Sequence, residues 1–177
     1  LINAVDHEEC RIAKVSDNKL EDFHIESASK EITQGNIYKG IITRVEPSLQ
    51  ASFIDYGAER HGFLQKHEIH RDYFQDSLSG DLSINKIVKR GQELLVQISK
   101  DPIARKGAML TTFISLPGRY LVLMPGSDHR GISRKIEDED ERARLKEIMN
   151  QINLPEDFGM IVRTVGAACT KTQLNKD

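Results

Sequence analysis

The chain has few cysteines, few aromatic residues and no long apolar run. Its only cysteines are Cys10 and Cys169, which stand near opposite ends of the 177 residues. Two distant thiols exclude a disulfide scaffold or a four-cysteine zinc site within the chain, and they fit a reducing compartment. No apolar stretch is long enough to cross a bilayer, and no signal peptide opens the sequence. Because the first residue is Leu1 and not Met, we expect the natural protein to begin further upstream.

The sequence also lacks an excess of positive charge. Its 25 Lys and Arg are outnumbered by 27 Asp and Glu, which gives a formal net charge of −2 at pH 7. A polyanionic partner would therefore need basic residues that are gathered locally. Residues 86–106 hold such a group, because only Glu93 and Asp101 oppose its six basic members: Lys86, Lys89, Arg90, Lys100, Arg105 and Lys106.

No set of residues typical of catalysis or of metal binding stands out. A Ser-His-Asp set, a P-loop and paired carboxylates are all missing. His67 and His70 lack the spacing of a zinc-binding helix and a third ligand. The acidic run at 137–141 fits the first turn of a helix, where carboxylates are favoured by the helix dipole. Asp55 is expected to fix a turn, and His61, although it is placed where it can touch a phosphate, is not a credible general base on its own.

Apolar patterning predicts a mainly β chain of the α+β class. Residues 1–25 indicate β-structure with a turn at 16–19, and the polar stretch 26–36 indicates a linker. Five short strands then follow with one long polar excursion at 67–86, which favours a small closed barrel over an open sheet. The strands are expected at 37–46, 49–57, 60–64, 93–101 and 108–115.

From residue 116 the pattern changes. An apolar strand is expected at 119–125, a Gly- and Arg-containing loop at 126–135 and a further strand at 158–166. Leu145, Ile148, Met149 and Ile152 stand at helical spacing, so 137–152 is predicted to be a helix. Pro155 lies just past its end, where a helix stop is expected.

Phe53 and Phe63 stand close together in a chain that is only 6% aromatic. They are either two core side chains, which is the commoner fate of Phe, or two stacking surfaces on an outward barrel face. Alternation along a strand means that Phe53 and Ile54 cannot both point inward. Together with the basic group at 86–106, this favours the stacking interpretation.

The segment GNIYKGIITRVEPSLQASFIDYGAERHGFL resembles the S-one-type OB fold, an RNA-binding barrel whose signature includes the FIDYG and GFL strings found here. The longer string VEPSLQASFIDYGAERHGFL is more specific. Together with LINA, KGAMLTTFISLPGRYLVLMP and GMIVRT, in collinear order, it resembles the bacterial ribonuclease E/G family over nearly the whole chain.

The resemblance implies roles for seven residues. Phe53 and Phe63 match aromatics that stack on bases near the cleavage point, and Lys106 matches a lysine that contacts the RNA backbone. A second set matches a pocket for a 5′ monophosphate, to which Gly118 and Val122 contribute backbone and Arg163 and Thr164 contribute side chains. A guanidinium offers two parallel donors to phosphate oxygens, although Arg163 taken alone, without the resemblance, would better suit a surface ion pair.

The same resemblance implies three parts. Residues 1–34 would be the N-terminal piece of a split RNase-H-like subdomain, 35–115 the five-stranded OB barrel, and 116–177 a partial 5′-sensor subdomain. The loop cations Arg130, Arg134 and Lys135 either guide the RNA end or form an ordinary solvated face.

The implied function is RNA binding and 5′-end sensing within a single-strand-specific endoribonuclease of bacterial rRNA maturation and mRNA turnover. Mg²⁺ and structural Zn²⁺ are expected in the full-length family with ligands outside this chain, so the chain itself should not cleave RNA. The expected partner of the chain is RNA, not DNA. A homo-oligomer, degradosome-type partners and a cytoplasmic location, with peripheral inner-membrane attachment as an option, are also implied. Two alternatives stay open, a non-catalytic RNA-binding module and a metal-dependent hydrolase acting within this chain. The E-type and G-type branches are not separated.

Overall fold

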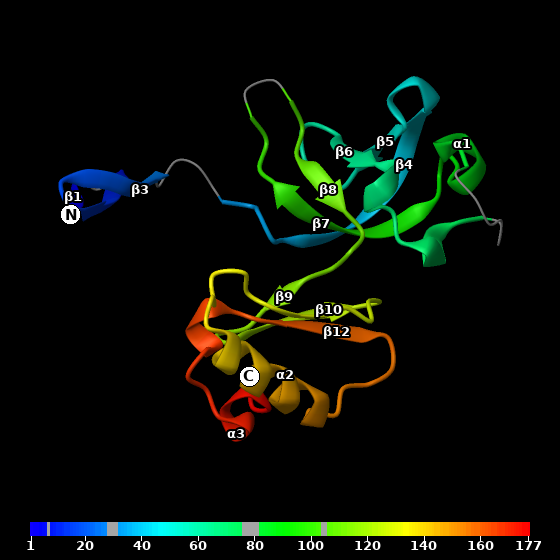
Figure 1. The fold of residues 1–177 in the computed structure, drawn as a ribbon. Helices are drawn as coiled ribbons and strands as arrows, with labels where there is room; N and C mark the ends of the chain where they lie inside the picture. The colour runs from blue at the N-terminus through cyan, green and yellow to red at the C-terminus, as the bar shows by residue number, and fades with distance from the viewer. Residues whose placement is uncertain (7, 28–31, 76–81, 104–105) are drawn as a thin grey trace. The chain divides into compact units, whose positions relative to one another are not determined.

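The computed structural model describes residues 1–6, 8–27, 32–75, 82–103 and 106–177 (Figure 1). The chain divides into two compact units, Leu1–Thr33 and Gln34–Asp177. No helix in these ranges is both long and apolar enough to span a membrane. The structure is mainly β, as predicted.

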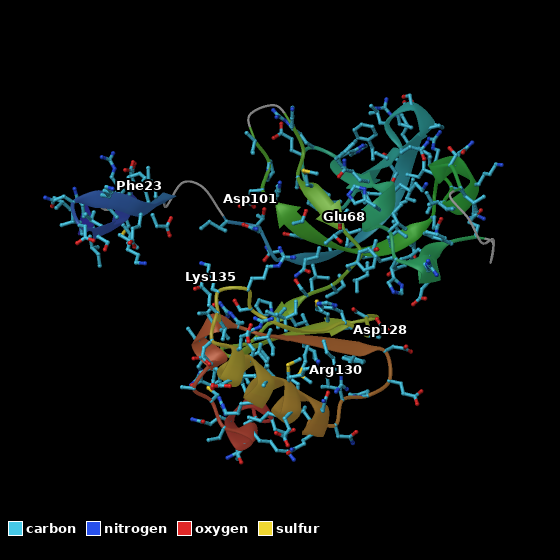
Figure 2. The ribbon with its side chains drawn as sticks, viewed as in Figure 1. Phe23, Glu68, Asp101, Asp128, Arg130 and Lys135 are labelled. Carbon is cyan, nitrogen blue, oxygen red and sulfur yellow. The ribbon has the colours of Figure 1, made fainter. Side chains whose placement is uncertain are left out.

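The first unit is a three-stranded antiparallel sheet in the order β1-β2-β3, formed by β1 (Ile2–Asp6), β2 (Glu9–Ser16) and β3 (Lys19–Ser27). Asp17 and Asn18 join β2 to β3 with φ of 48° and 58°, a conformation that Asp and Asn tolerate in tight hairpin turns. The apolar side chain of Val5 is exposed, and so is that of Phe23, which is labelled in Figure 2. Neither hydrophobic core of the described residues includes a side chain from this unit.

The second unit begins with a closed barrel in the strand order β4-β5-β6-β8-β7. Its strands are β4 (Ile37–Glu46), β5 (Ala51–Asp55), β6 (Gly62–Gln65), β7 (Glu93–Lys100) and β8 (Met109–Thr111). All neighbours are antiparallel except β6 and β8, which are parallel. The five predicted strands are therefore confirmed, although β5 and β8 are shorter than the ranges expected at 49–57 and 108–115. Short helices lie between them: η1 (Pro47–Leu49), η2 (Lys66–Glu68), η3 (Arg71–Tyr73) and α1 (Ile84–Ile87).

The barrel core explains which faces of β5 and β6 are free. Ile54 and Leu64 are completely buried, together with Ile84 and Ile87 of α1. Their sequence neighbours on the opposite strand faces are only half-buried and lie outside the core. Gly62 is required beside this core, because a Cβ there would lie 2.4 Å from the Leu110 side chain.

The rest of the second unit is a sheet with helices on one face (Figure 1). The order is β11-β12-β10-β9, formed by β9 (Leu116–Pro117), β10 (Leu121–Pro125), β11 (Arg130–Ile132) and β12 (Phe158–Val162). The helix α2 (Glu139–Gln151) confirms the predicted helix, and its Leu145 and Met149 belong to one core cluster with Met160 of β12. Asp138 caps α2 by accepting the Glu141 N–H at 2.8 Å, so the acidic run does form a helix start.

Four elements of this part were not predicted: β9, β11, α3 and the short helix η4 (Thr164–Gly166), which replaces the end of the strand expected at 158–166. The short strand β11 lies within the predicted loop and pairs in parallel with β12. The helix α3 (Lys171–Leu174) lies in the polar tail, where Thr170 and Gln173 form a capping box. Both elements are too short for a periodic apolar pattern, so neither carries the signal by which the longer elements were found.

Candidate functional site

A row of four side chains crosses the barrel surface. Cα partners run from Arg44 on β4 to Phe53 on β5, then to Phe63 on β6 and Met109 on β8. Cross-strand partners project from the same face of a sheet. We call these four residues the aromatic row.

A register shift in β4 places Arg44 in the row. Ile42 pairs with Ile54 but Arg44 pairs with Phe53, which leaves Thr43 as an extra residue. A bulge of this kind re-aims the side chains beside it. The Thr43 hydroxyl donates to the Phe53 carbonyl at 3.1 Å and lies 3.1 Å from Nδ1 of His61. Thr43 therefore ties the bulge to the loop that holds His61.

The two Phe rings of the row are close but not parallel. Their centroids are 5.7 Å apart and their planes are inclined by 66°. The Arg44 guanidinium carbon lies 4.3 Å from the Phe53 centroid, a cation–π contact. Because the rings meet edge to face, a flat ligand would stack on one ring and meet the edge of the other.

The row borders a surface pocket of about 750 Å³. All three residues predicted for RNA contact, Phe53, Phe63 and Lys106, line it. The other residues that line the pocket are Glu59, Arg60, His61, Gly107 and Met109. Of these, only His61 was singled out from the sequence, for contact with a phosphate. The sequence signal that could have identified Glu59, Arg60 and His61 is their position in the AERHGF string, immediately before Phe63.

Gly107 brings Lys106 to this pocket. A Cβ at Gly107 would lie 1.9 Å from the His61 carbonyl oxygen, a distance that no side chain can occupy. The neighbouring Ala108 carbonyl accepts the Phe63 N–H at 2.8 Å. The Lys106 loop therefore lies directly against the 59–61 loop because glycine permits this approach.

The second predicted group gathers around the turn between β9 and β10. The Arg163 side chain donates through Nη1 to the Gly118 carbonyl at 2.5 Å, and its backbone N–H donates to Tyr120 O at 2.8 Å. Thr164 Oγ1 lies 2.9 Å from Ser133 Oγ. Val122 follows the turn on β10, paired with Pro117 and Ile161. No ion pair among the described residues involves Arg163, so the surface-pair alternative has no carboxylate partner among them.

Asp177 fixes this turn, and sequence reasoning missed it. Its carboxylate accepts three consecutive backbone N–H groups, from Arg119 at 3.0 Å, Tyr120 at 2.8 Å and Leu121 at 2.9 Å. A Cβ at Gly118 would lie 2.4 Å from Asp177 Oδ2, so glycine is needed for this contact. Burial alone would raise the pKa of the Asp177 carboxyl, but the three backbone hydrogen bonds outweigh it and lower the pKa.

We expect Asp177→Asn to loosen the 119–121 turn and to remove one source of acid sensitivity. A lowered folded pKa stabilises the fold above the unfolded pKa, about 3.9 for Asp, and this contribution is lost as pH falls through the folded value. Amide hydrogen exchange at 119–121 should accelerate about fivefold for each hydrogen bond weakened by about 1 kcal/mol. Asp128→Asn, an exposed carboxylate on another loop, is the control. Equal exchange rates and acid profiles in the two variants would contradict this role of Asp177.

Several other residues have structural partners. His70 caps η3 by accepting the Asp72 N–H, and Asp55 accepts the Gly57 N–H at 3.1 Å, as predicted for a turn. Within the described ranges, no three His, Cys, Asp or Glu side chains are grouped as a metal site would require. Of the predicted basic group, Arg105 lies outside the described residues.

The loop at 126–135 contains β11, and the residue after β11, Ser133, contacts Val162 and Thr164 on either side of Arg163. Ser133 N–H donates to Val162 O at 2.8 Å, which places Arg134 and Lys135 next in sequence to the Ser133–Thr164 contact. Both of these cations are exposed. Arg130 instead donates to the Met149 carbonyl of α2 at 3.1 Å (Figure 2). The structure therefore separates Arg130, which contacts α2, from Arg134 and Lys135, which follow Ser133 in the sequence.

Comparison with known proteins gives a consistent result. The S1 RNA binding domain model matches residues 31–111, and the Ribonuclease E/G family model matches 115–177. Ribonuclease E of Haemophilus influenzae is 51% identical over 180 residues, covering 100% of this chain and 19% of that protein. Ribonuclease E of Escherichia coli is 52% identical, with 100% and 17% covered. Ribonuclease G of Salmonella typhimurium is 40% identical over 176 residues, with 96% and 35% covered.

The chain thus spans about a fifth of the ribonuclease E relatives that it matches. Its identity is higher to these two ribonuclease E proteins than to the ribonuclease G of Salmonella typhimurium. Two family matches cover the barrel and the following sheet, and the relatives align over the whole chain. The chain belongs to the ribonuclease E/G family.

Proposed function

We propose that this chain is the RNA-binding and 5′-end-sensing part of a single-strand-specific endoribonuclease of bacterial rRNA maturation and mRNA turnover. The observation that carries the proposal is the pocket in which Phe53, Phe63 and Lys106 meet. Membership of the ribonuclease E/G family and the match to an S1 RNA binding domain support it.

The chemistry of the pocket suits a single strand. Half-buried rings offer π faces on which unpaired bases stack, at about 1–3 kcal/mol per base. In an RNA duplex the bases are paired and stacked on each other, so these faces would have no partner. Lys106 at the rim supplies a positive charge for the backbone phosphates.

The proposal extends to the turn that holds Gly118. Arg163 and Thr164 are exposed there and supply a guanidinium and a hydroxyl, which suit the oxygens of a 5′ monophosphate. A triphosphate would bring charge that so few donors cannot pair. In this proposal residues 1–34 belong to a split RNase-H-like subdomain, 35–115 to the OB barrel and 116–177 to the 5′ sensor.

Cleavage is proposed to depend on residues outside 1–177. The described residues offer no group of three metal-ligating side chains, so this part of the chain does not fit the Mg²⁺ and Zn²⁺ sites expected for the full-length protein. We place both sets of ligands elsewhere and derive no catalytic step here. Homo-oligomer formation and degradosome-type partners belong to the same proposal for the whole protein.

Binding and cleavage assays on the purified chain test this division. We expect a single-stranded RNA to bind with an affinity that falls linearly with salt on a log–log scale, with a slope of about −0.7 for each phosphate contacted. We expect no cleavage in the presence of Mg²⁺. Cleavage by the chain alone would place the catalytic residues within it, whereas absence of RNA binding would remove the proposal.

A non-catalytic RNA-binding module is the second candidate, because the S1 RNA binding domain match alone describes the barrel equally well. The two candidates differ in the longer protein that carries this chain. If the endoribonuclease candidate is right, the longer protein cuts RNA and the cutting depends on Arg163. If the non-catalytic candidate is right, the longer protein does not cut RNA.

A further inference from the structure

A second groove, of about 510 Å³, adjoins the aromatic row on the side of Arg44. It lies between β4 and the segment that connects α1 to β7. The residues that line it are Thr43, Arg44, Val45, Asn85, Val88, Lys89 and Arg90. We call it the basic groove.

The basic groove has the charge of an anion site. Its lining in the described part of the chain includes three cations, Arg44, Lys89 and Arg90, and no carboxylate. All three are exposed, and no ion pair among the described residues engages them. On a chain with a net charge of −2, three such cations in one groove form a local positive field.

The backbone of the groove is firmly held. Gly91 N–H donates to Ile42 O at 2.7 Å, and Ile42 N–H donates to Gln92 O at 2.9 Å. The Lys89 N–H donates to Gln92 Oε1 at 3.2 Å, and Val88 is buried beneath it. Lys89 and Arg90 therefore project from a fixed segment of the barrel.

Arg44 connects the basic groove to the pocket at Phe53. It lines the groove, and its guanidinium lies 4.3 Å from the Phe53 ring centroid. Neighbouring strands are about 4.8 Å apart, so the row from Arg44 to Met109 crosses three such spacings along one barrel face. Lys106 lines the pocket beside the row and Arg44 lines the basic groove, so a strand stacked on Phe53 and Phe63 would find a cation at each of these two hollows.

We propose that the basic groove is a second RNA subsite, which binds the phosphodiester backbone of the same strand whose bases stack on Phe53 and Phe63. Arg44 supplies a donor fork beside the ring, and Lys89 and Arg90 contact the next phosphates. This inference rests on the proposed function, because it requires RNA at the aromatic row.

Variants in α1 and in the segment between α1 and β7 test the subsite. The double variant Lys89→Ala, Arg90→Ala removes two groove cations that follow α1, and Lys86→Ala removes an exposed cation within α1 that does not line the groove. Each protein is titrated with a tetranucleotide and with a single-stranded RNA of about 12 nucleotides, lengths within the range of OB-fold site sizes. The melting temperature of each variant is measured alongside.

For the longer RNA we expect the double variant to bind about tenfold more weakly, with a salt slope that is less steep by about 1.4, or about 0.7 for each phosphate that is no longer neutralised. The tetranucleotide should bind within twofold of the wild type, and Lys86→Ala should change neither RNA by more than twofold. The subsite would be rejected if Lys86→Ala lost as much affinity as the double variant, or if the double variant lost equal affinity for both RNA lengths. Either result would mean that diffuse positive charge, and not the basic groove, binds the RNA.

The two proposals fail in different ways. If Phe63→Ala weakens both RNAs while the double variant binds like the wild type, the subsite is wrong and the proposed function stands. If neither RNA binds the wild-type chain, both are wrong. If the double variant keeps its RNA affinity but loses binding of polyglutamate, the groove serves an acidic protein and the RNA subsite is rejected.

Discussion

Replacement of Phe63 by alanine is expected to weaken single-stranded RNA binding by about 5- to 150-fold, the equivalent of about 1–3 kcal/mol for one stacked base. The ring lines the pocket and packs at 5.7 Å against Phe53, yet it lies outside the buried core. The variant should therefore stay folded. Fluorescence anisotropy with a labelled oligonucleotide gives the affinity, and circular dichroism gives the melting temperature.

The neighbouring residue is the matched control. Leu64 is 0% exposed and belongs to the barrel core, so Leu64→Ala should lower the free energy of unfolding by about 2–5 kcal/mol. Its RNA affinity should be retained at temperatures where the protein is folded. If Phe63→Ala instead unfolds the barrel, with affinity following stability, Phe63 is a core residue and the stacking interpretation is wrong.

Replacement of Arg163 by alanine is expected to abolish the preference for 5′-monophosphorylated RNA over RNA with a 5′ hydroxyl. A hydrogen bond to a charged group contributes about 1.5–3 kcal/mol, so the preference should fall from about 10- to 150-fold to near unity. The substitution removes the Nη1 group that donates to the Gly118 carbonyl. It also removes the two parallel N–H donors of the guanidinium that the oxygens of a phosphate would accept. Competition binding with two oligonucleotides that differ only at the 5′ end measures the ratio.

Two comparisons make the Arg163 result specific. Arg163→Lys keeps the charge but loses the fork, so it should restore only part of the preference. A circular RNA has no 5′ end, and its affinity should not change in either variant. A preference that survives Arg163→Ala unchanged would remove the 5′-sensor assignment.

The barrel was predictable because its residues alternate at the period of a strand. Burial of Ile54 and Leu64 forces Phe53 and Phe63 to the opposite strand faces. That alternation, with the family resemblance, was enough to place Phe53 and Phe63 in one site from the amino-acid sequence alone. The position of Lys106 in the same pocket depended on the resemblance, since its approach relies on Gly107 and a backbone contact with His61.

Other features depend on long-range geometry. The bulge at Thr43 sets Arg44 opposite Phe53, whereas regular pairing from Ile42 onward would set Thr43 there. Asp177 contacts residues 56 to 58 positions away in the sequence. Neither contact follows from local periodicity or composition, which report only on neighbouring residues.

The most direct test of stacking at the aromatic row is photo-crosslinking. Single-stranded RNA that carries one 5-iodouridine is bound to the chain and irradiated, and the crosslinked peptides are identified by mass spectrometry. We predict adducts on Phe53 and Phe63, and fewer of them when unlabelled RNA competes. Adducts confined to exposed rings elsewhere, such as Phe23 or Phe113, would contradict the claim that this pocket holds the bases.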